Sequence, residues 1–261
     1  MITVPLWLNL SPLAHLGGPP TPVPTPAPVA PTAAPPAATA TEPPRGDPSI
    51  VAADAFARSM PVGWGSADIG GTYRVSGDGA LNVAGAHGNV QLTSSADGSA
   101  VLDAVVVRDV VVEHSVALDA NVVGELRDVS ILRASSGAHY AIVVRMGPSG
   151  VLVGVERTVD GQTTVIGRFV SPTDSVSSAS LAGGSLRIHA EVTGADPSTI
   201  RVRIWPAAVP EPSSWLLTTI DWAGSLQQAG AVGLGWESTT AAGGAMHFSD
   251  LTAWVTGEEA Q

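Results

Sequence analysis

Residues Leu186–Trp205 read LRIHAEVTGADPSTIRVRIW, two alternating segments separated by a turn sequence. In Leu186–Val192 every second side chain is apolar and the side chains between are polar or charged, and Ile200–Trp205 alternates in the same way. Successive side chains of a strand point to opposite faces, so each segment has one buried side and one solvent-facing side. We therefore predict an antiparallel hairpin in a sheet with one wet face.

Similar segments recur from Ser49 to Gly257, separated by Gly, Asp and Ser turns at intervals of about 8–14 residues. Asp160-Gly161 supplies a positive-φ turn for a second hairpin, Val151–Phe169. The sole helical pattern is Gly224–Ala229. The predicted fold is all-β, a two-sheet antiparallel jelly-roll sandwich preceded by an extended Pro-rich tether. The strand candidates are Thr72–Ser76, Ala80–Val83, Val90–Leu92, Ser99–Val107, Val110–Leu118, Leu126–Ala134, His139–Met146, Gly150–Thr158, Gln162–Val170, Leu186–Thr193, Thr199–Ile204, Leu216–Asp221, Ala231–Trp236 and Ala245–Thr256.

The tether is residues 19–48, which are rich in Pro, Ala and Thr and, with the residues before them, hold most of the 21 prolines. Repeated proline fixes φ and removes backbone donors, which favours a semi-rigid polyproline conformation. At ~3.1 Å per residue, about 30 residues can reach about 90 Å. We therefore divide the chain into an N-terminal peptide (1–18), a linker (19–48), a sandwich (49–257) and a short tail (258–261).

The N-terminal peptide is apolar and alternates. Because proline and asparagine interrupt it and it is short, we expect it not to span a membrane. No basic residue precedes its apolar run, so we expect no secretory signal. As an extended strand it could either dock by adding to a partner's sheet or pack on its own domain. The side chains on its apolar side are Ile2, Val4, Leu6, Leu8 and Leu10.

Composition excludes several classes of function. The chain has no cysteine, which excludes disulfides and thiolate metal sites. Its net charge of −11 argues against a nucleic-acid partner, which requires a basic face. The six histidines are scattered singly without metal-ligand spacing. Three of them, His114, His139 and His189, fall in alternating strands, where we expect them on the wet face.

Several segments of the predicted sandwich stand out together: Asp54–Arg58, Gly63–Gly65, Ala67–Gly71, Val110–Leu118, Arg201–Trp205, Glu211–Trp215, Ala231–Leu234 and Phe248–Leu251. With them, Ala53–Thr256 resembles the concanavalin A-like, laminin G-like jelly-roll modules of actinobacterial extracellular proteins and of the minor tail proteins of their phages. The resemblance implies two packed, curved antiparallel sheets whose first and last strands are adjacent.

Enzymes of this fold that cleave glucans carry a Glu-x-Asp-x-x-Glu strand, and glycoside hydrolysis needs such a carboxylate pair. This motif is missing here: Glu113 and Asp119 have opposite strand parity, and Glu125 with Asp128 fits no better. We therefore expect no enzymatic activity.

The resemblance also implies a possible structural calcium, for which Asp54 and Asp250 are the matching positions. Calcium takes six to eight oxygen ligands, so two carboxylates are only a beginning. The alternatives are that Asp54 caps the turn before Phe56 and that Asp250 pairs with Arg58.

Tryptophans are the candidate sugar-binding residues, because aromatic faces pack against sugar C–H surfaces. We select Trp205, Trp215 and Trp64, against the alternative that each is a packing anchor. Phe56 and Phe248 are predicted to be core residues.

The function we expect is that of a virion attachment or decoration protein, present in many copies. On this hypothesis the N-terminal peptide binds other virion proteins and the sandwich binds host-surface glycans. The alternatives are a bacterial extracellular or cell-surface carbohydrate-binding module without catalytic activity, and a decoration domain that stabilises a particle and has no ligand.

Overall fold

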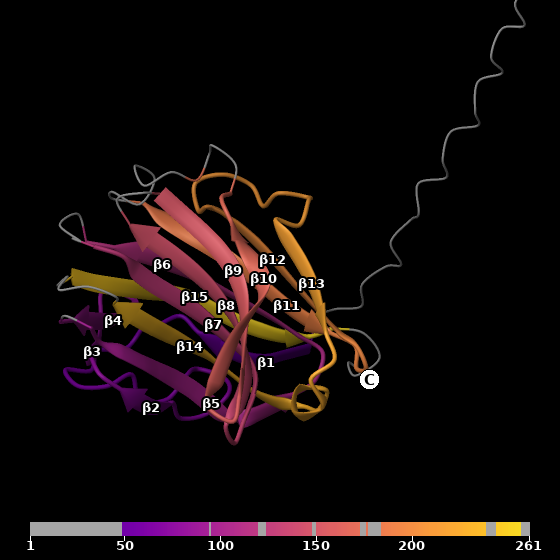
Figure 1. Ribbon diagram of the computed structural model, residues 1–261. Helices are drawn as coiled ribbons and strands as arrows, with labels where there is room; N and C mark the ends of the chain where they lie inside the picture. Colours follow the sequence, from indigo (N-terminus) through magenta and orange to yellow (C-terminus); the bar gives the residue numbers. More distant parts are fainter. Residues whose placement is uncertain are drawn as a thin grey trace, which may run out of the picture. The chain divides into compact units, whose positions relative to one another are not determined.

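The computed structural model describes residues 49–93, 95–119, 124–147, 150–172, 176, 184–238 and 244–256 (Figure 1). The N-terminal peptide, the linker and the tail lie outside the described residues, so the predictions made for them are not addressed by the fold. Within the described residues, no helix is long and apolar enough to cross a membrane.

Strands make up most of the described residues. Each predicted strand overlaps an observed one, and the helical pattern is a single 3-10 turn, η1 (Gly224–Leu226). The first strand, β1, was not predicted. The strands are β1 (Ser49–Asp54), β2 (Arg74–Gly77), β3 (Ala80–Ala84), β4 (His87–Leu92), β5 (Asp97–Val107), β6 (Val110–Leu118), β7 (Leu126–Ser135), β8 (Ala138–Gly147), β9 (Gly150–Val159), β10 (Gln162–Val170), β11 (Ser185–Thr193), β12 (Ser198–Pro206), β13 (Leu217–Asp221), β14 (Gly230–Ser238) and β15 (Gly244–Val255).

The strands form two antiparallel sheets that pack face to face, which confirms the predicted sandwich (Figure 1). Sheet I has the order β13-β12-β11-β6-β15-β4-β3, with β1 also paired to β15. Sheet II has the order β10-β9-β8-β7-β14-β5-β2. The pairing of β1 with β15 makes the first and last strands adjacent, as the resemblance implied.

One side of β15 is shared by two strands. Residues Gly244–Phe248 pair with β4, and Leu251–Val255 pair with β1, while β6 runs along the other side. The register shifts between the two halves, where Asp250 has a φ of 54°. A β-bulge at this point lets one strand serve two neighbours.

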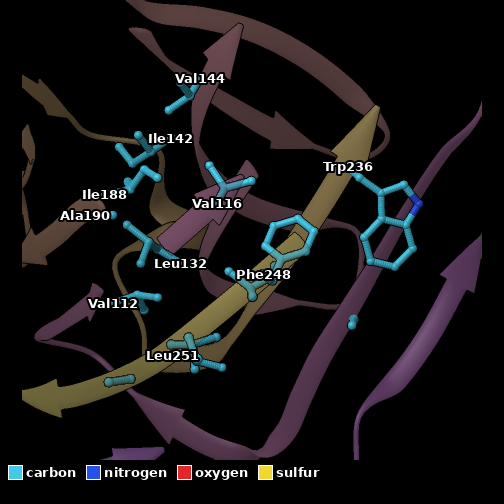
Figure 2. Close-up of a cluster of buried hydrophobic side chains, with 14 of the residues drawn as sticks. Val112, Val116, Leu132, Ile142, Val144, Ile188, Ala190, Trp236, Phe248 and Leu251 are labelled. Atoms are coloured by element: carbon cyan, nitrogen blue, oxygen red, sulfur yellow. The ribbon is translucent and has the colours of Figure 1, made fainter. Parts of the chain in front are cut away.

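The core lies between the sheets and follows from the alternation of the strands. Figure 2 shows Ile188 and Ala190 of sheet I close to Leu132 and Ile142 of sheet II, and all four are buried. Burial of this apolar surface, at about 25 cal/mol per Å², is the main stabilising contribution. Toward one end the core becomes aromatic. The rings of Phe56, Trp64, Tyr73, Trp236 and Phe248 pack together there.

Both predicted hairpins are observed. The β11–β12 hairpin keeps an unbroken register from Leu186–Pro206 to Thr193–Thr199. In the β9–β10 hairpin Asp160 and Gly161 have φ values of 51° and 74°, which is the left-handed turn conformation that the sequence predicted.

The interior also holds polar groups that the sequence did not predict. His114 faces the core instead of solvent, and both His114 and Asp128 are fully buried. The Nε2 atom of His114 lies 3.0 Å and 3.2 Å from the two carboxylate oxygens of Asp128, which connects the two sheets. The prediction of a wet-face position for His114 was wrong, because the neighbouring Glu113 takes the outer face of β6 and successive side chains point to opposite faces.

Candidate functional site

The outer face of sheet II carries a groove whose floor is set by strand register. Ser76, Ser99, Gly235, Val129 and Val143 lie directly opposite one another, one on each of β2, β5, β14, β7 and β8. Ser99, Gly235 and Val143 each have a core residue beside them on the strand and therefore point outward. Ser76 and Val129 lie on the same face because they are paired with Ser99 and Gly235. Most of these side chains are small, so the outer surface of sheet II is hollowed along this row.

A second row of paired residues, on β8, β9 and β10, forms one side of the groove. His139, Thr158 and Thr163 are paired across β8, β9 and β10, and Glu156 pairs with Ala141 beside them. The enclosed volume is about 360 Å³. This volume falls at the lower end of the range of roughly 300–1,000 Å³ that is typical of small-ligand sites.

The charged groups of the groove are mainly acidic. Asp97, Glu156 and Glu237 line it together with His139. Burial lowers the pKa of the His139 imidazole, which is therefore neutral near pH 7. A neutral imidazole can accept one hydrogen bond and donate another, and the carboxylates accept hydrogen bonds from hydroxyls.

Two arginines stand beside the groove and are held by other groups. Arg127 donates to Glu237 at 2.8 Å, and the guanidinium of Arg145 stacks 3.8 Å from the centre of the Phe169 ring. Arg145 also lies 4.0 Å from Glu156. These contacts fix the carboxylates of Glu156 and Glu237 at the edge of the groove and compensate part of their charge.

A second cluster lies on the outer face of sheet I. Glu113 of β6, His189 of β11 and Glu211 of the β12–β13 loop place one ligand atom each within 4.8 Å of one another. The Nδ1 atom of His189 is 3.3 Å from Glu211 Oε1 and 3.5 Å from Glu113 Oε2. Although it is on the outer face, His189 is only 4% exposed. The predicted face of His189 is therefore correct, but its predicted exposure to solvent is wrong, because Trp215 of the loop packs against its ring.

Arginine and tryptophan side chains complete this cluster. Arg187 donates to Glu113 Oε1, and Arg203 donates to Glu211 Oε1 at 2.5 Å. Burial works to raise the pKa of Glu113, but the contacts with His189 and Arg187 outweigh it and hold the pKa below its ordinary value. The ring of Trp215 lies 3.8 Å from the Arg203 guanidinium and packs edge-on against His189.

The three predicted sugar-binding tryptophans do not lie in the groove. Trp64 is 0% exposed in the aromatic part of the core, where its indole N–H donates to the carbonyl of Asn89, so that ring is a packing anchor. Trp205 is buried at the end of β12. Trp215 is partly exposed, but on sheet I, with one face against Arg203.

The two predicted calcium ligands have separate roles. Asp54 is buried, and its carboxylate accepts hydrogen bonds from the backbone N–H of Phe56, from the Arg58 guanidinium and from the Tyr73 hydroxyl. The capping alternative for Asp54 is therefore confirmed, and Arg58 pairs with Asp54 rather than with Asp250. Asp250 occupies the β15 bulge described above.

Sequence reasoning missed both groupings. Glu113, His189 and Glu211 are far apart in the chain, so no spacing motif could reveal them. The available signal was strand parity: the pairing of His189 with Glu113 places both on the outer face of neighbouring strands. The groove had a weaker signal, the glycines at alternate positions of Gly233-Leu234-Gly235.

Comparison with known proteins supports the fold. No protein-family model and no curated protein matches the sequence. Among solved structures, the chain is similar to the CBM2 module of the evolved Dit of Lactobacillus casei BL23 phage J-1. The identity is 10% over 80% of this chain and 97% of that one, with a TM-score of 0.52. It also matches the carbohydrate-binding module CBM66 from Bacillus subtilis, at 12% identity over 69% of this chain and 94% of that one, with a TM-score of 0.47. At 10% identity the likeness to the Dit module is one of fold alone, and it agrees with the two-sheet β-sandwich of the described residues.

Proposed function

We propose that the chain is a non-catalytic glycan-binding protein whose sandwich binds sugars in the groove on sheet II. The observation that carries this proposal is the groove itself, a row of small side chains bordered by carboxylates, hydroxyls and a neutral imidazole. A floor with few protruding side chains admits the ring of a sugar, and the polar border can pair with its hydroxyls. Unpaired polar groups in a complex are costly, so this border provides selectivity.

The charge of the border selects the sugar class. With Asp97, Glu156 and Glu237 lining the groove, an anionic sugar would meet repulsion, whereas a neutral sugar or an amino sugar would not. The proposed ligands are therefore neutral or amino-sugar glycans. A single groove of this size gives weak binding, which many copies on one particle would strengthen.

We further propose that the protein is part of a virion, with the N-terminal peptide bound to other virion proteins and residues 19–48 acting as a spacer. The alternating apolar pattern of Ile2–Leu10 and the proline-rich composition support this arrangement. The fold similarity to a module of a phage Dit is in keeping with it. Structural calcium at Asp54 and Asp250 is not part of the proposal, because the Asp54 carboxylate is already bonded to Arg58 and Tyr73.

The glycan proposal is tested by blocking the groove. Ser99 and Ser249 are both half-buried serines on outer faces, on sheet II and sheet I respectively. The hydroxyl of Ser99 is hydrogen-bonded to that of Ser76, and the hydroxyl of Ser249 donates to Asp250. We expect Ser99→Trp to abolish retention of the full chain on immobilised neutral and N-acetylated glycans, and the matched Ser249→Trp to leave it unchanged. Equal retention of the two variants would exclude the groove as the binding site.

The virion proposal is tested separately. Deletion of residues 1–18 is expected to remove the protein from purified particles while leaving glycan binding by the isolated chain intact. Particles that still contain the truncated protein would refute docking through this peptide.

A further inference from the structure

The second cluster, on the opposite side of the sandwich from the groove, has a geometry of its own. We propose that Glu113, His189 and Glu211 bind a divalent transition-metal ion, with zinc as the representative case. The site is independent of the glycan groove, because its three ligands belong to sheet I and to the loop that covers it.

The spacing of the donor atoms is the first argument. Zinc lies about 2.0–2.2 Å from nitrogen and carboxylate ligands in a tetrahedral arrangement, so two of its ligands are roughly 3.3–3.5 Å apart. The Nδ1 atom of His189 lies 3.3 Å and 3.5 Å from the carboxylate oxygens of Glu211 and Glu113. These two distances match two edges of such a tetrahedron, and the two carboxylate oxygens lie within 4.8 Å of each other. A good N–H···O hydrogen bond is shorter, at about 2.9 Å.

The state of the imidazole is the second and independent argument. His189 is 4% exposed, yet neither of its ring nitrogens has a hydrogen-bond partner. A buried polar group without a partner is uncommon and requires an explanation. Trp215 and Trp254 pack edge-on against the ring at centroid distances of 5.4 Å and 5.7 Å, so its orientation toward the two carboxylates is fixed. A metal ion would use Nδ1, which approaches the two carboxylates at ion-pair distance without making a hydrogen bond to either.

The arginines act as outer-shell groups. Arg187 bonds one oxygen of Glu113 and leaves the other directed at His189, an arrangement that orients a carboxylate ligand. Arg203 bonds the same Glu211 oxygen that approaches His189, so an ion would share that oxygen. The two guanidinium charges balance the two carboxylates, and the site therefore binds metal more weakly than a closed structural zinc site.

The donor set determines the class of ion. One imidazole nitrogen and two carboxylate oxygens suit zinc, cobalt, nickel or manganese. Calcium and magnesium take oxygen ligands alone, and calcium requires six to eight of them. The bound ion would connect β6, β11 and the β12–β13 loop, and it would hold that loop against sheet I.

The test uses the full chain after treatment with a chelator and desalting. Zinc is titrated by calorimetry, and cobalt is titrated while its visible absorption is recorded, since four-coordinate cobalt has intense ligand-field bands. We expect one ion per chain. Glu211→Gln, on the exposed loop, is expected to weaken binding by roughly ten-fold or more, and His189→Ala is expected to abolish it.

The matched control is His247→Ala. His247 is also an outward-facing histidine on sheet I, where it contacts Asp119 and Asn89 and lies beside His87. We expect its replacement to leave the titration unchanged. Failure of the wild-type chain to bind either ion at millimolar concentration would overturn the proposal. So would wild-type affinity in both Glu211→Gln and His189→Ala, or loss of binding in His247→Ala instead. Glycan retention is unaffected in either case, so the two proposals fail separately.

Discussion

The buried His114–Asp128 pair allows a stability prediction that depends on which partner is removed. Both side chains are fully buried between the sheets, 3.0 Å apart at their nearest atoms. His114→Leu leaves the Asp128 carboxylate without its partner in the core. A buried carboxylate left without its partner costs about 3–5 kcal/mol. Asp128→Val leaves the imidazole without its partner, and an unpaired buried polar group costs about 1–3 kcal/mol.

The double variant separates the pair from its surroundings. Replacing a buried pair by apolar side chains of similar volume is often neutral or stabilising, and the neighbouring Phe248 ring, 6.1 Å from the imidazole, provides an apolar contact. We therefore expect His114→Leu/Asp128→Val to be more stable than His114→Leu by about 3 kcal/mol. The free energies of unfolding are measured by urea denaturation followed by circular dichroism. Equal losses in the two single variants, or additive losses in the double variant, would refute the reasoning.

Three further predictions follow from buried or crowded groups. Arg133 is 1% exposed and donates to three backbone carbonyls, so Arg133→Met should cost at least about 3–5 kcal/mol in urea denaturation; a cost below about 1 kcal/mol would contradict this. Burial lowers the pKa of His139 in the folded state, so the unfolded chain binds the proton more readily and stability falls as the pH drops below about 6.5. His139→Gln should reduce the loss of melting temperature between pH 7 and pH 5, and parallel profiles would refute the assignment. A Cβ on Gly98 would lie 2.7 Å from the indole nitrogen of Trp236, so Gly98→Ala should lower the melting temperature, whereas Gly224→Ala, where a Cβ meets nothing within 4 Å, should not.

The strands were predictable because their pattern is local. In Leu186–Val192 each residue's face is visible from its neighbours, and Asp160-Gly161 shows the turn by its chemistry alone. β1 was missed because its sequence, SIVAAD, is short and consists mostly of small side chains, so it shows no clear alternation of apolar and polar residues. What makes it a strand is the partner that β15 provides, and that partner lies about 200 residues later.

The sites were less accessible to such reasoning. A tryptophan in the sequence does not reveal whether its ring faces a ligand, and Trp64 is buried because Phe56, Tyr73 and Phe248 surround it. The Glu113–His189–Glu211 cluster exists only because β6 and β11 are neighbours and a loop folds over them. The register of the sheets and the path of the loop are tertiary properties, and they determine which residues come together in the metal cluster and in the groove.

The junction of β1 with β15 has a mechanical consequence. The chain enters the sandwich at Ser49, so any tension transmitted from the residues before it reaches β1 first. β1 is paired to one half of one strand, and at its inner end Asp54 is bonded to Arg58 and Tyr73. Under a pulling force the β1–β15 pairs nearest Ser49 would separate first. The hydrogen bonds of the buried Asp54 carboxylate would resist further separation. Separation of Ser49 and Ile50, which are both exposed, would lengthen the attachment, whereas separation as far as Ala52 would expose a fully buried core residue.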